Sequence, residues 1–138
     1  VFMSGWALTS DCWGYQMAPL SESARCIAYD SRGHGRSSDP GRGFDADTLA
    51  DDLAAVLDAL ELKNVTLVTH SMASGEAVRY LSRHGSKRIA RIALVAATLP
   101  FLMKTADNPD GIDPAVFENG RRNVLLKTLD ALGLGFDS

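Results

Sequence analysis

Residues 65–75 read VTLVTHSMASG, and this stretch decides the fold class that we predict for the chain. Its first residues are apolar and β-branched, which favours a strand buried on both faces, and residues 72–84 read as a helix ended by Gly85. A serine at a direct strand-to-helix turn is the setting of a nucleophile elbow, which projects the hydroxyl above the sheet. The turn therefore predicts that Ser71 is a nucleophile. The alternative is an ordinary helix N-cap, a common role of serine.

The elbow departs from the usual Gly-x-Ser-x-Gly pattern at both flanking positions. Thr69 stands where the first glycine belongs, and Ala73 stands where the second belongs. Small residues are needed there because the backbone around the serine is strained and large neighbours collide. Ala73 is a mild change, whereas the β-branched Thr69 bears on how tightly the turn can close. The N–H of Met72 lies at a helix N-terminus, where it can donate to the oxyanion of a tetrahedral intermediate.

Outward from this turn the chain alternates short β-rich runs with longer helical patterns. The expected strands are residues 25–29, 65–69 and 89–96, with a strand end at 1–3, and the expected helices are 12–20, 47–60 and 72–84. Residues 65–69 and 89–96 are nearly continuous in apolarity, which fits strands buried on both faces. This alternation predicts βαβ units and an α/β fold with a parallel sheet and flanking helices. Helix 47–60 has Asp45 or Asp47 as its N-cap and carries one apolar stripe, formed by Leu49, Leu53, Val56, Leu57 and Leu60.

Composition and charge exclude several classes of protein. At 138 residues the chain is long enough for one modest domain, and its net charge of −3 gives no footprint for nucleic acid. The longest apolar run, residues 92–103, is interrupted by Pro100 and is too short to span a membrane, and no secretory leader opens the chain. Two cysteines, Cys12 and Cys26, make neither a disulfide framework nor a metal site. We expect reduced, buried thiols and a cytoplasmic protein.

A second element supports the nucleophile. Ser4-Gly5-Trp6 follows the opening strand end. Hydrolases that carry a nucleophile elbow on an α/β sheet place their other oxyanion-hole donor at this position. Gly5 permits a close backbone approach, and the N–H of Trp6 would then donate to the oxyanion. An ordinary strand-ending turn with a buried tryptophan is the alternative for this tripeptide alone.

Taken in order, the motifs of the chain resemble one branch of the α/β-hydrolase family, the cofactor-free haloperoxidases and aryl esterases, also called non-haem chloroperoxidases or perhydrolases. The collinear motifs are Ser4-Gly5-Trp6, residues 29–37 (YDSRGHGRS), 48–53 (TLADDL), His70-Ser71-Met72 with Gly75-Glu76, Arg83-His84-Gly85, and Lys104-Thr105 with Asn108-Pro109. The resemblance implies that Ser71 is the nucleophile and that Trp6 and Met72 supply the oxyanion-hole amides. It also implies acyl transfer through acyl-Ser71 to water or hydrogen peroxide, from small ester or carboxylate substrates, with no haem or metal.

The same resemblance implies a boundary and an incomplete fold. Residues 1–98 correspond to a partial hydrolase core and residues 99–138 to the start of a helical cap, beginning with a loop at 105–114 and a helical stretch at 114–132. The chain opens at a strand end and closes without a further strand, so we expect the first and the C-terminal strands to be missing. Open sheet edges would then favour self-association with another copy.

The rest of a catalytic triad is absent from this sequence. In this fold the order is Ser, then Asp or Glu, then His, and the last histidine here is His84, immediately after the elbow helix. His70 adjoins Ser71 on a turn where neighbouring side chains diverge, and His34 lies in a loop that the family uses structurally. We therefore expect none of the three to be the general base, and a serine without a base is not activated. Ser4 replaces a family histidine, and Thr69, Ala73 and Ser74 replace glycines.

The sequence bears on three alternatives to an active serine esterase. The main one is a truncated, inactive hydrolase that acts only as a binding or self-associating module, which the missing histidine favours. A nucleotide-binding domain is rejected because Gly33-His34-Gly35 is followed by Ser38 in place of a third glycine, and no P-loop occurs. A metal-dependent hydrolase is rejected because no His or Cys pair has ligand spacing on one face.

Overall fold

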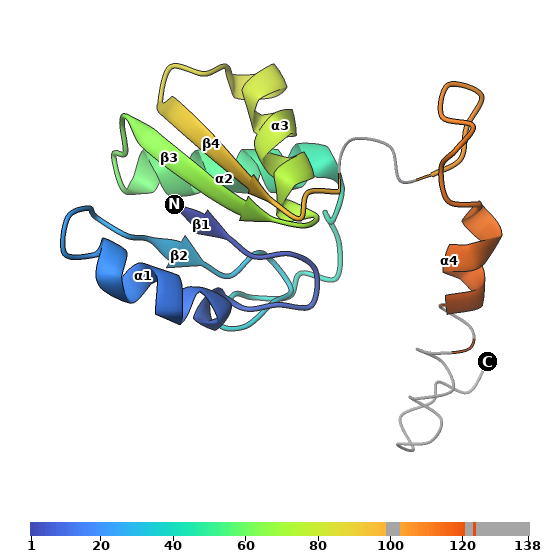
Figure 1. Ribbon diagram of the computed structural model, residues 1–138, viewed down its shortest axis with the longest axis horizontal. Coiled ribbons are helices and arrows are strands. Elements are labelled where there is room, and N and C mark those ends of the chain that lie inside the picture. Colours follow the sequence, from blue (N-terminus) through green and yellow to red (C-terminus); the bar gives the residue numbers. More distant parts are fainter. Residues whose placement is uncertain (99–102, 121–122, 124–138) are drawn as a thin grey trace. The chain divides into compact units, whose positions relative to one another are not determined.

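The computed structural model describes residues 1–98, 103–120 and 123 (Figure 1). The chain divides into two compact units, residues 1–99 and 100–138. A parallel sheet with its helices makes up the first unit, and the described residues of the second include a short helix. Within the described ranges, no helix is both long enough and apolar enough to cross a membrane.

The first unit is built on a four-stranded parallel sheet. Its strands are β1 (Phe2–Met3), β2 (Ala28–Tyr29), β3 (Val65–His70) and β4 (Ile89–Val95). Their spatial order is β2-β1-β3-β4, and every neighbouring pair runs parallel. The chain moves from β1 to one side and later to the other, so the sheet order reverses between β1 and β3. In open parallel sheets, ligands bind beyond the carboxyl ends of the strands at such a reversal.

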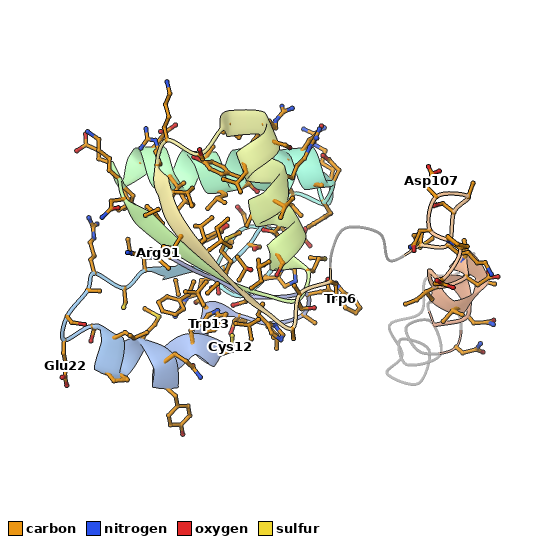
Figure 2. The ribbon with its side chains drawn as sticks, turned by 45° about the horizontal axis from the view of Figure 1, so that its top comes forward. Trp6, Cys12, Trp13, Glu22, Arg91 and Asp107 are labelled. Carbon is orange, nitrogen blue, oxygen red and sulfur yellow. The ribbon has the colours of Figure 1, made fainter. Side chains whose placement is uncertain are left out.

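Helices cover both faces of the sheet. They are η1 (Ser10–Trp13), α1 (Gly14–Leu20), α2 (Ala46–Ala59) and α3 (Ala73–His84). Successive side chains of a strand point to opposite faces. Phe2 contacts Trp13 of η1 with 5.3 Å between ring centroids, and Figure 2 shows Trp13 between the sheet and α1. Met3 is fully buried on the other face, in the core that α2 and α3 cover.

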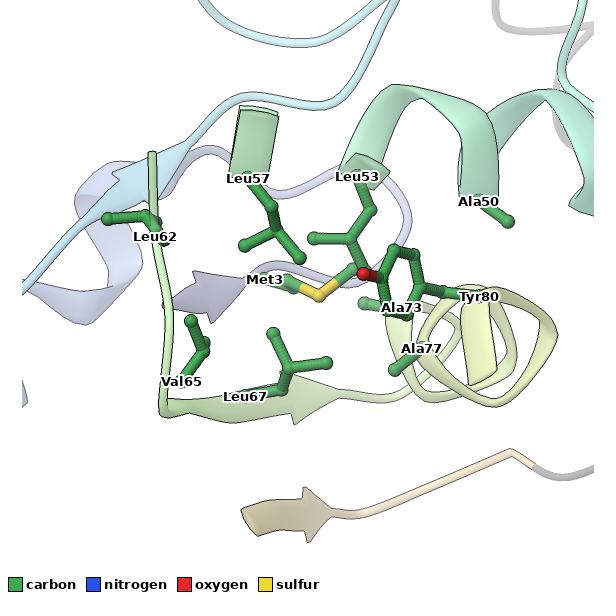
Figure 3. Packing of buried hydrophobic residues seen from close by; sticks show 10 residues of the cluster. All are labelled: Met3, Ala50, Leu53, Leu57, Leu62, Val65, Leu67, Ala73, Ala77 and Tyr80. Carbon is green, nitrogen blue, oxygen red and sulfur yellow. The ribbon is translucent and has the colours of Figure 1, made fainter. Parts of the chain in front are cut away.

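In the core, one apolar stripe of α2 and one of α3 pack against the sheet. Figure 3 shows its ten buried side chains, which are Met3, Ala50, Leu53, Leu57, Leu62, Val65, Leu67, Ala73, Ala77 and Tyr80. The apolar stripe predicted for α2 is confirmed at Leu49, Leu53 and Leu57, whereas Leu60 is 38% exposed because α2 ends at residue 59. Asp45 is the N-cap, since its side chain accepts from the N–H of Thr48 at 2.9 Å.

Three predictions about burial and length are wrong. β4 was expected to be buried on both faces, yet Leu94 and Val95 are 48% and 43% exposed, because β3 is its only sheet neighbour among the described residues. The thiol of Cys12 lies on an exposed residue and that of Cys26 on a half-buried one. β2 is shorter than the predicted strand 25–29.

The second unit contains α4 (Pro114–Gly120), which begins at the proline where a helix was predicted. Isolated bridges join Met103 to Ile112 and Thr105 to Asn108 ahead of it. The remainder of the predicted helix, apart from residue 123, lies outside the described residues. The assignment of residues 99–138 to the start of a cap stays a prediction.

Candidate active site

Ser71 occupies a sharp turn between β3 and α3. Its φ is 53°, in the left-handed region that is unfavourable for a residue with a Cβ. Three backbone hydrogen bonds hold it there. Its N–H donates to the carbonyl of Val95 at 3.0 Å, and its carbonyl accepts from the N–H of Ser74 at 3.1 Å and of Thr98 at 3.5 Å. The N-cap position of α3 is Met72, and no side chain caps this helix. The N-cap alternative for Ser71 is therefore wrong, and the backbone has the geometry of an elbow.

The two polar residues that replace glycines beside the elbow bind each other. Thr69 and Ser74 are both fully buried, and their hydroxyl oxygens lie 2.9 Å apart. The Thr69 hydroxyl also lies 3.4 Å from the carbonyl oxygen of Ala93. Because each hydroxyl has a partner, neither leaves an unsatisfied polar group in the interior. Thr69 is thus accommodated in the strand without opening the turn at Ser71.

Gly5 brings the first loop directly against the elbow. A Cβ added at Gly5 would lie 2.9 Å from the Cβ of Ser71 and 3.1 Å from the carbonyl oxygen of His70, closer than side chains tolerate. Only glycine permits this approach. The next residue, Trp6, is 66% exposed, and Figure 2 shows it at the end of the sheet to which the strand arrows point. Among the described residues, none accepts a hydrogen bond from the N–H of Trp6 or of Met72.

Side-chain hydrogen bonds fix the loop that carries Gly5. The Ser4 hydroxyl accepts from the indole N–H of Trp13 at 3.1 Å and donates to the carbonyl of Thr9 at 3.0 Å. Ser4 therefore holds the loop together through Trp13 and Thr9, and its placement at a family histidine stays a prediction.

Asp30 anchors the far end of this loop to the segment after β2. Its carboxylate accepts from the N–H of Ser10 at 2.6 Å and from the N–H of Arg36 at 2.9 Å. The bond from the Arg36 N–H, followed by that from Ser10, lowers the pKa of Asp30 to about 2, so the carboxylate stays ionised. Sequence reasoning placed this residue in a motif but gave it no role.

None of the three histidines is hydrogen-bonded to Ser71. His84 lies 2.7 Å from Asp51 and stacks on Tyr80, which is a surface arrangement of α2 and α3. His34 bonds to two backbone groups, and the Nδ1 of His70 is buried with no hydrogen-bond partner among the described residues. The absence of a general base for the serine stays a prediction.

One buried carboxyl group escaped the sequence reasoning. Glu76, in the first turn of α3, is 3% exposed and its Oε1 has no hydrogen-bond partner in the described part of the chain. Burial, with a smaller contribution from the charge of Asp52, raises the pKa of Glu76 to about 7. The buried hydroxyl of Tyr29 is also without a partner there, and burial raises its pKa as well. Glu76 interrupts the stripe formed by Ala73, Ala77 and Tyr80, a signal that could have identified it.

Two other features do not contribute to this site. A hollow of about 640 Å³ opens beside Val1, Cys26 and Lys63, at the amino ends of the strands and away from Ser71. Over the described ranges, no three His, Cys, Asp or Glu side chains are placed to hold a metal ion.

Comparison with known families agrees with this fold. The family model of the alpha/beta hydrolase fold matches residues 1–137. The chain belongs to the alpha/beta hydrolase family. Within this family, the resemblance to non-haem haloperoxidases predicted from the sequence is confirmed by similarity to individual members.

A non-heme chloroperoxidase from Kitasatospora aureofaciens is 44% identical over 126 residues, covering 91% of this chain and 46% of that protein. A bifunctional esterase/perhydrolase from Acinetobacter calcoaceticus is 41% identical over 127 residues, with the same coverage of 91% and 46%. The crystal structure of a bromoperoxidase from Bacillus anthracis matches with a TM-score of 0.82 and 42% identity, covering 95% of this chain and 50% of that one. This alpha/beta hydrolase chain thus spans about half the length of the relatives it matches.

Proposed function

We propose that this chain carries the nucleophile and the oxyanion hole of an acyl-transferring alpha/beta hydrolase. Ser71 is the nucleophile in this proposal, and the N–H groups of Trp6 and Met72 bind the oxyanion. The observation that carries the proposal is the left-handed Ser71 at a strand-to-helix turn with Gly5 pressed against its Cβ. Relatives named as chloroperoxidases and as an esterase/perhydrolase support a small ester or carboxylate substrate.

The chemistry follows from what each group can do. A base removes the proton of the Ser71 hydroxyl as its oxygen attacks the acyl carbonyl carbon. The carbonyl oxygen becomes an oxyanion, to which the N–H groups of Trp6 and Met72 donate. Collapse of this intermediate expels the alcohol with a proton and leaves acyl-Ser71. Water then yields the carboxylic acid, whereas hydrogen peroxide yields a peracid, and either frees the serine.

Among the described residues, no histidine is hydrogen-bonded to Ser71. We therefore propose that turnover needs a histidine and an acid that this chain does not supply, and that the chain holds half of the catalytic machinery. A cytoplasmic setting and a mechanism without haem or metal form part of the same proposal.

The nucleophile can be tested by supplying the missing base as free imidazole. The chain is incubated with p-nitrophenyl acetate and imidazole, and acetylated peptides are identified by mass spectrometry. Acetyl should accumulate on Ser71 well above exposed serines such as Ser38, since one oxyanion-hole donor alone is worth about 10²-fold in rate. The Ser71→Ala variant should lose that peptide signal and keep the surface background. Equal labelling of Ser71 and Ser38 would refute the proposed nucleophile.

A second candidate function is a non-catalytic module that associates with a second copy of itself through β4. The half-exposed Leu94 and Val95 on this strand, and its single sheet neighbour among the described residues, favour this reading. Analytical ultracentrifugation over a range of concentrations should detect a dimer that a Leu94→Lys variant weakens. A monomer at all concentrations would exclude this candidate.

A further inference from the structure

The loop that brings Trp6 toward Ser71 contains a turn with an unusual residue at its third position. The N–H of Leu8 donates to the carbonyl of Gly5 at 3.2 Å and closes a four-residue turn. Ala7, the third residue, has a φ of 61°, whereas Trp6 is not among the residues with a positive φ. This combination marks a type II turn, whose third position ordinarily holds glycine. Alanine is strained there, so the conformation persists only if other contacts enforce it.

His34 makes the contact that enforces it. Its Nε2 lies 3.1 Å from the N–H nitrogen of Ala7, and its Nδ1 lies 3.0 Å from the carbonyl oxygen of Arg32. A backbone N–H can only donate and a carbonyl can only accept. The hydrogen must therefore sit on Nδ1, while Nε2 offers its lone pair to Ala7. These two backbone partners select one tautomer of the neutral imidazole.

The loop around His34 is itself tightly folded. The N–H of His34 donates to the carbonyl of Ser31, and its own carbonyl accepts from Ser37, each at 3.0 Å. The Ser37 hydroxyl in turn donates to the carbonyl of Asp30 at 2.6 Å. The folded loop of residues 31–37 thus fixes the position of the imidazole, which contacts Ala7 from 27 residues away along the chain.

The charged side chains of the loop of residues 31–37 form ion pairs with carboxylates. Arg32 forms a bidentate ion pair with Asp52 of α2, and both of its hydrogen bonds are 2.6 Å long. Arg36 pairs with Asp30 and with Asp11 of η1. From β3, the ring of His70 lies against Gly5 on the same loop. Arg32 and Arg36 thus have carboxylate partners of their own.

We propose that His34 is a positioning residue for the oxyanion hole: its neutral Nε2 holds the Trp6–Ala7 peptide in the left-handed turn and thereby keeps the Trp6 N–H beside Ser71. The inference rests on the proposed function, because Trp6 matters only if it binds the oxyanion. Protonation of His34 places a second N–H opposite the N–H of Ala7, where no hydrogen bond can form. The strained turn then loses its support, and the peptide can rotate so that Ala7 relaxes to a negative φ.

The geometry is tested by nitrogen-15 NMR of the labelled chain. The imidazole shifts of His34 should report a hydrogen on Nδ1, and the amide signal of Ala7 should change with pH at the same midpoint as the His34 ring. In His34→Leu, which lacks an acceptor, exchange of the Ala7 amide with solvent should accelerate on the order of tenfold. His34→Gln restores an acceptor and should restore protection, while His84→Gln is the matched control. A hydrogen on Nε2, or an Ala7 amide signal that does not change when His34 is protonated, would overturn the proposal. This holds even if His34→Leu fails to fold.

The catalytic consequence is read from imidazole-driven acetylation of Ser71. The rate should fall about tenfold in His34→Leu, which corresponds to one lost hydrogen bond, and recover in His34→Gln. Equal rates in the wild type and both variants would overturn the role of His34 while leaving the proposed nucleophile intact. Absence of acetyl on Ser71 in every variant would instead refute the proposed function, and the NMR result would still decide the tautomer.

Discussion

The end of the sheet around Ser71 and the α2–α3 layer beneath it are held together in different ways. At the sheet end, hydrogen bonds between segments far apart in sequence enforce two left-handed residues, Ala7 and Ser71. The α2–α3 layer is an apolar stripe packed on the sheet, with Arg–Asp pairs along its exposed rim. The layer provides stability, whereas the sheet end stores strain that can serve chemistry. Four sets of substitutions break or sharpen this contrast.

The largest loss of stability should come from the layer. Leu53 is fully buried in the core, so Leu53→Ala should lower the free energy of unfolding by about 2–5 kcal/mol. Val78, on α3 of the same layer, is 41% exposed, and Val78→Ala should change it by only about 0.5 kcal/mol. Urea titration followed by circular dichroism measures both. Equal losses would mean that the layer does not form the core.

The next effect depends on pH. The pKa of Glu76 is raised from 4.5 to about 7, so the folded protein prefers the neutral carboxyl group. Its contribution to stability is fully present below pH 4.5 and is lost as the pH rises through 7, a few kcal/mol at most. Glu76→Gln keeps the shape without the charge and should be more stable than the wild type at pH 8 but not at pH 4. If the stabilities of Glu76→Gln and the wild type differ by the same amount at pH 4 and at pH 8, the buried-carboxyl explanation is contradicted.

A smaller effect is expected for the hydroxyl pair beside the elbow. Thr69→Val leaves the Ser74 hydroxyl buried without its partner, which should cost about 1–3 kcal/mol. Ser74→Ala should cost a similar amount, while the double variant should recover part of the loss because no orphaned hydroxyl remains. A double-mutant cycle in urea measures the coupling. Strictly additive losses would show that the two hydroxyls do not depend on each other.

The smallest effect should come from the rim of the layer. Asp51 accepts from Arg83 at 2.7 Å and lies 2.7 Å from Nε2 of His84, and the hydrogen bond from Arg83, then that from His84, lowers the pKa of Asp51 to about 2. The pair is exposed and screened, so Asp51→Asn should lower the melting temperature less than Leu53→Ala or Thr69→Val does. The stability that the carboxylate adds is present above its ordinary pKa of 3.8 and disappears as the pH falls through 2. Persistence of the full difference in about 1 M salt would contradict a screened pair.

The same contrast explains what the sequence could and could not predict. Periodicity placed α2 and α3 correctly to within a residue or two, and Asp45 and Gly85 marked where they begin and end. The strand-to-helix turn at Ser71 is likewise local, so it could be identified from consecutive residues. Each of these signals lies within one segment and needs no knowledge of its neighbours.

The contacts that shape the site join different segments and leave no periodic signal. The bond from Ala7 to His34 spans 27 residues, and that from Ser10 to Asp30 spans 20. The burial of β4 was overestimated for a related reason. An apolar strand resembles a central one in sequence, but its exposure depends on which strands lie beside it.

The most direct test of the account compares two glycines. In imidazole with p-nitrophenyl acetate, the ratio of acetyl on Ser71 to acetyl on Ser38 is measured in the wild type, in Gly5→Ala and in Gly14→Ala. A Cβ at Gly5 collides with Ser71, whereas one at Gly14 meets nothing within 4 Å. We expect the ratio to fall about 10²-fold in Gly5→Ala and to stay unchanged in Gly14→Ala. An unchanged ratio in Gly5→Ala would contradict the claim that this loop and Ser71 form one catalytic half-site.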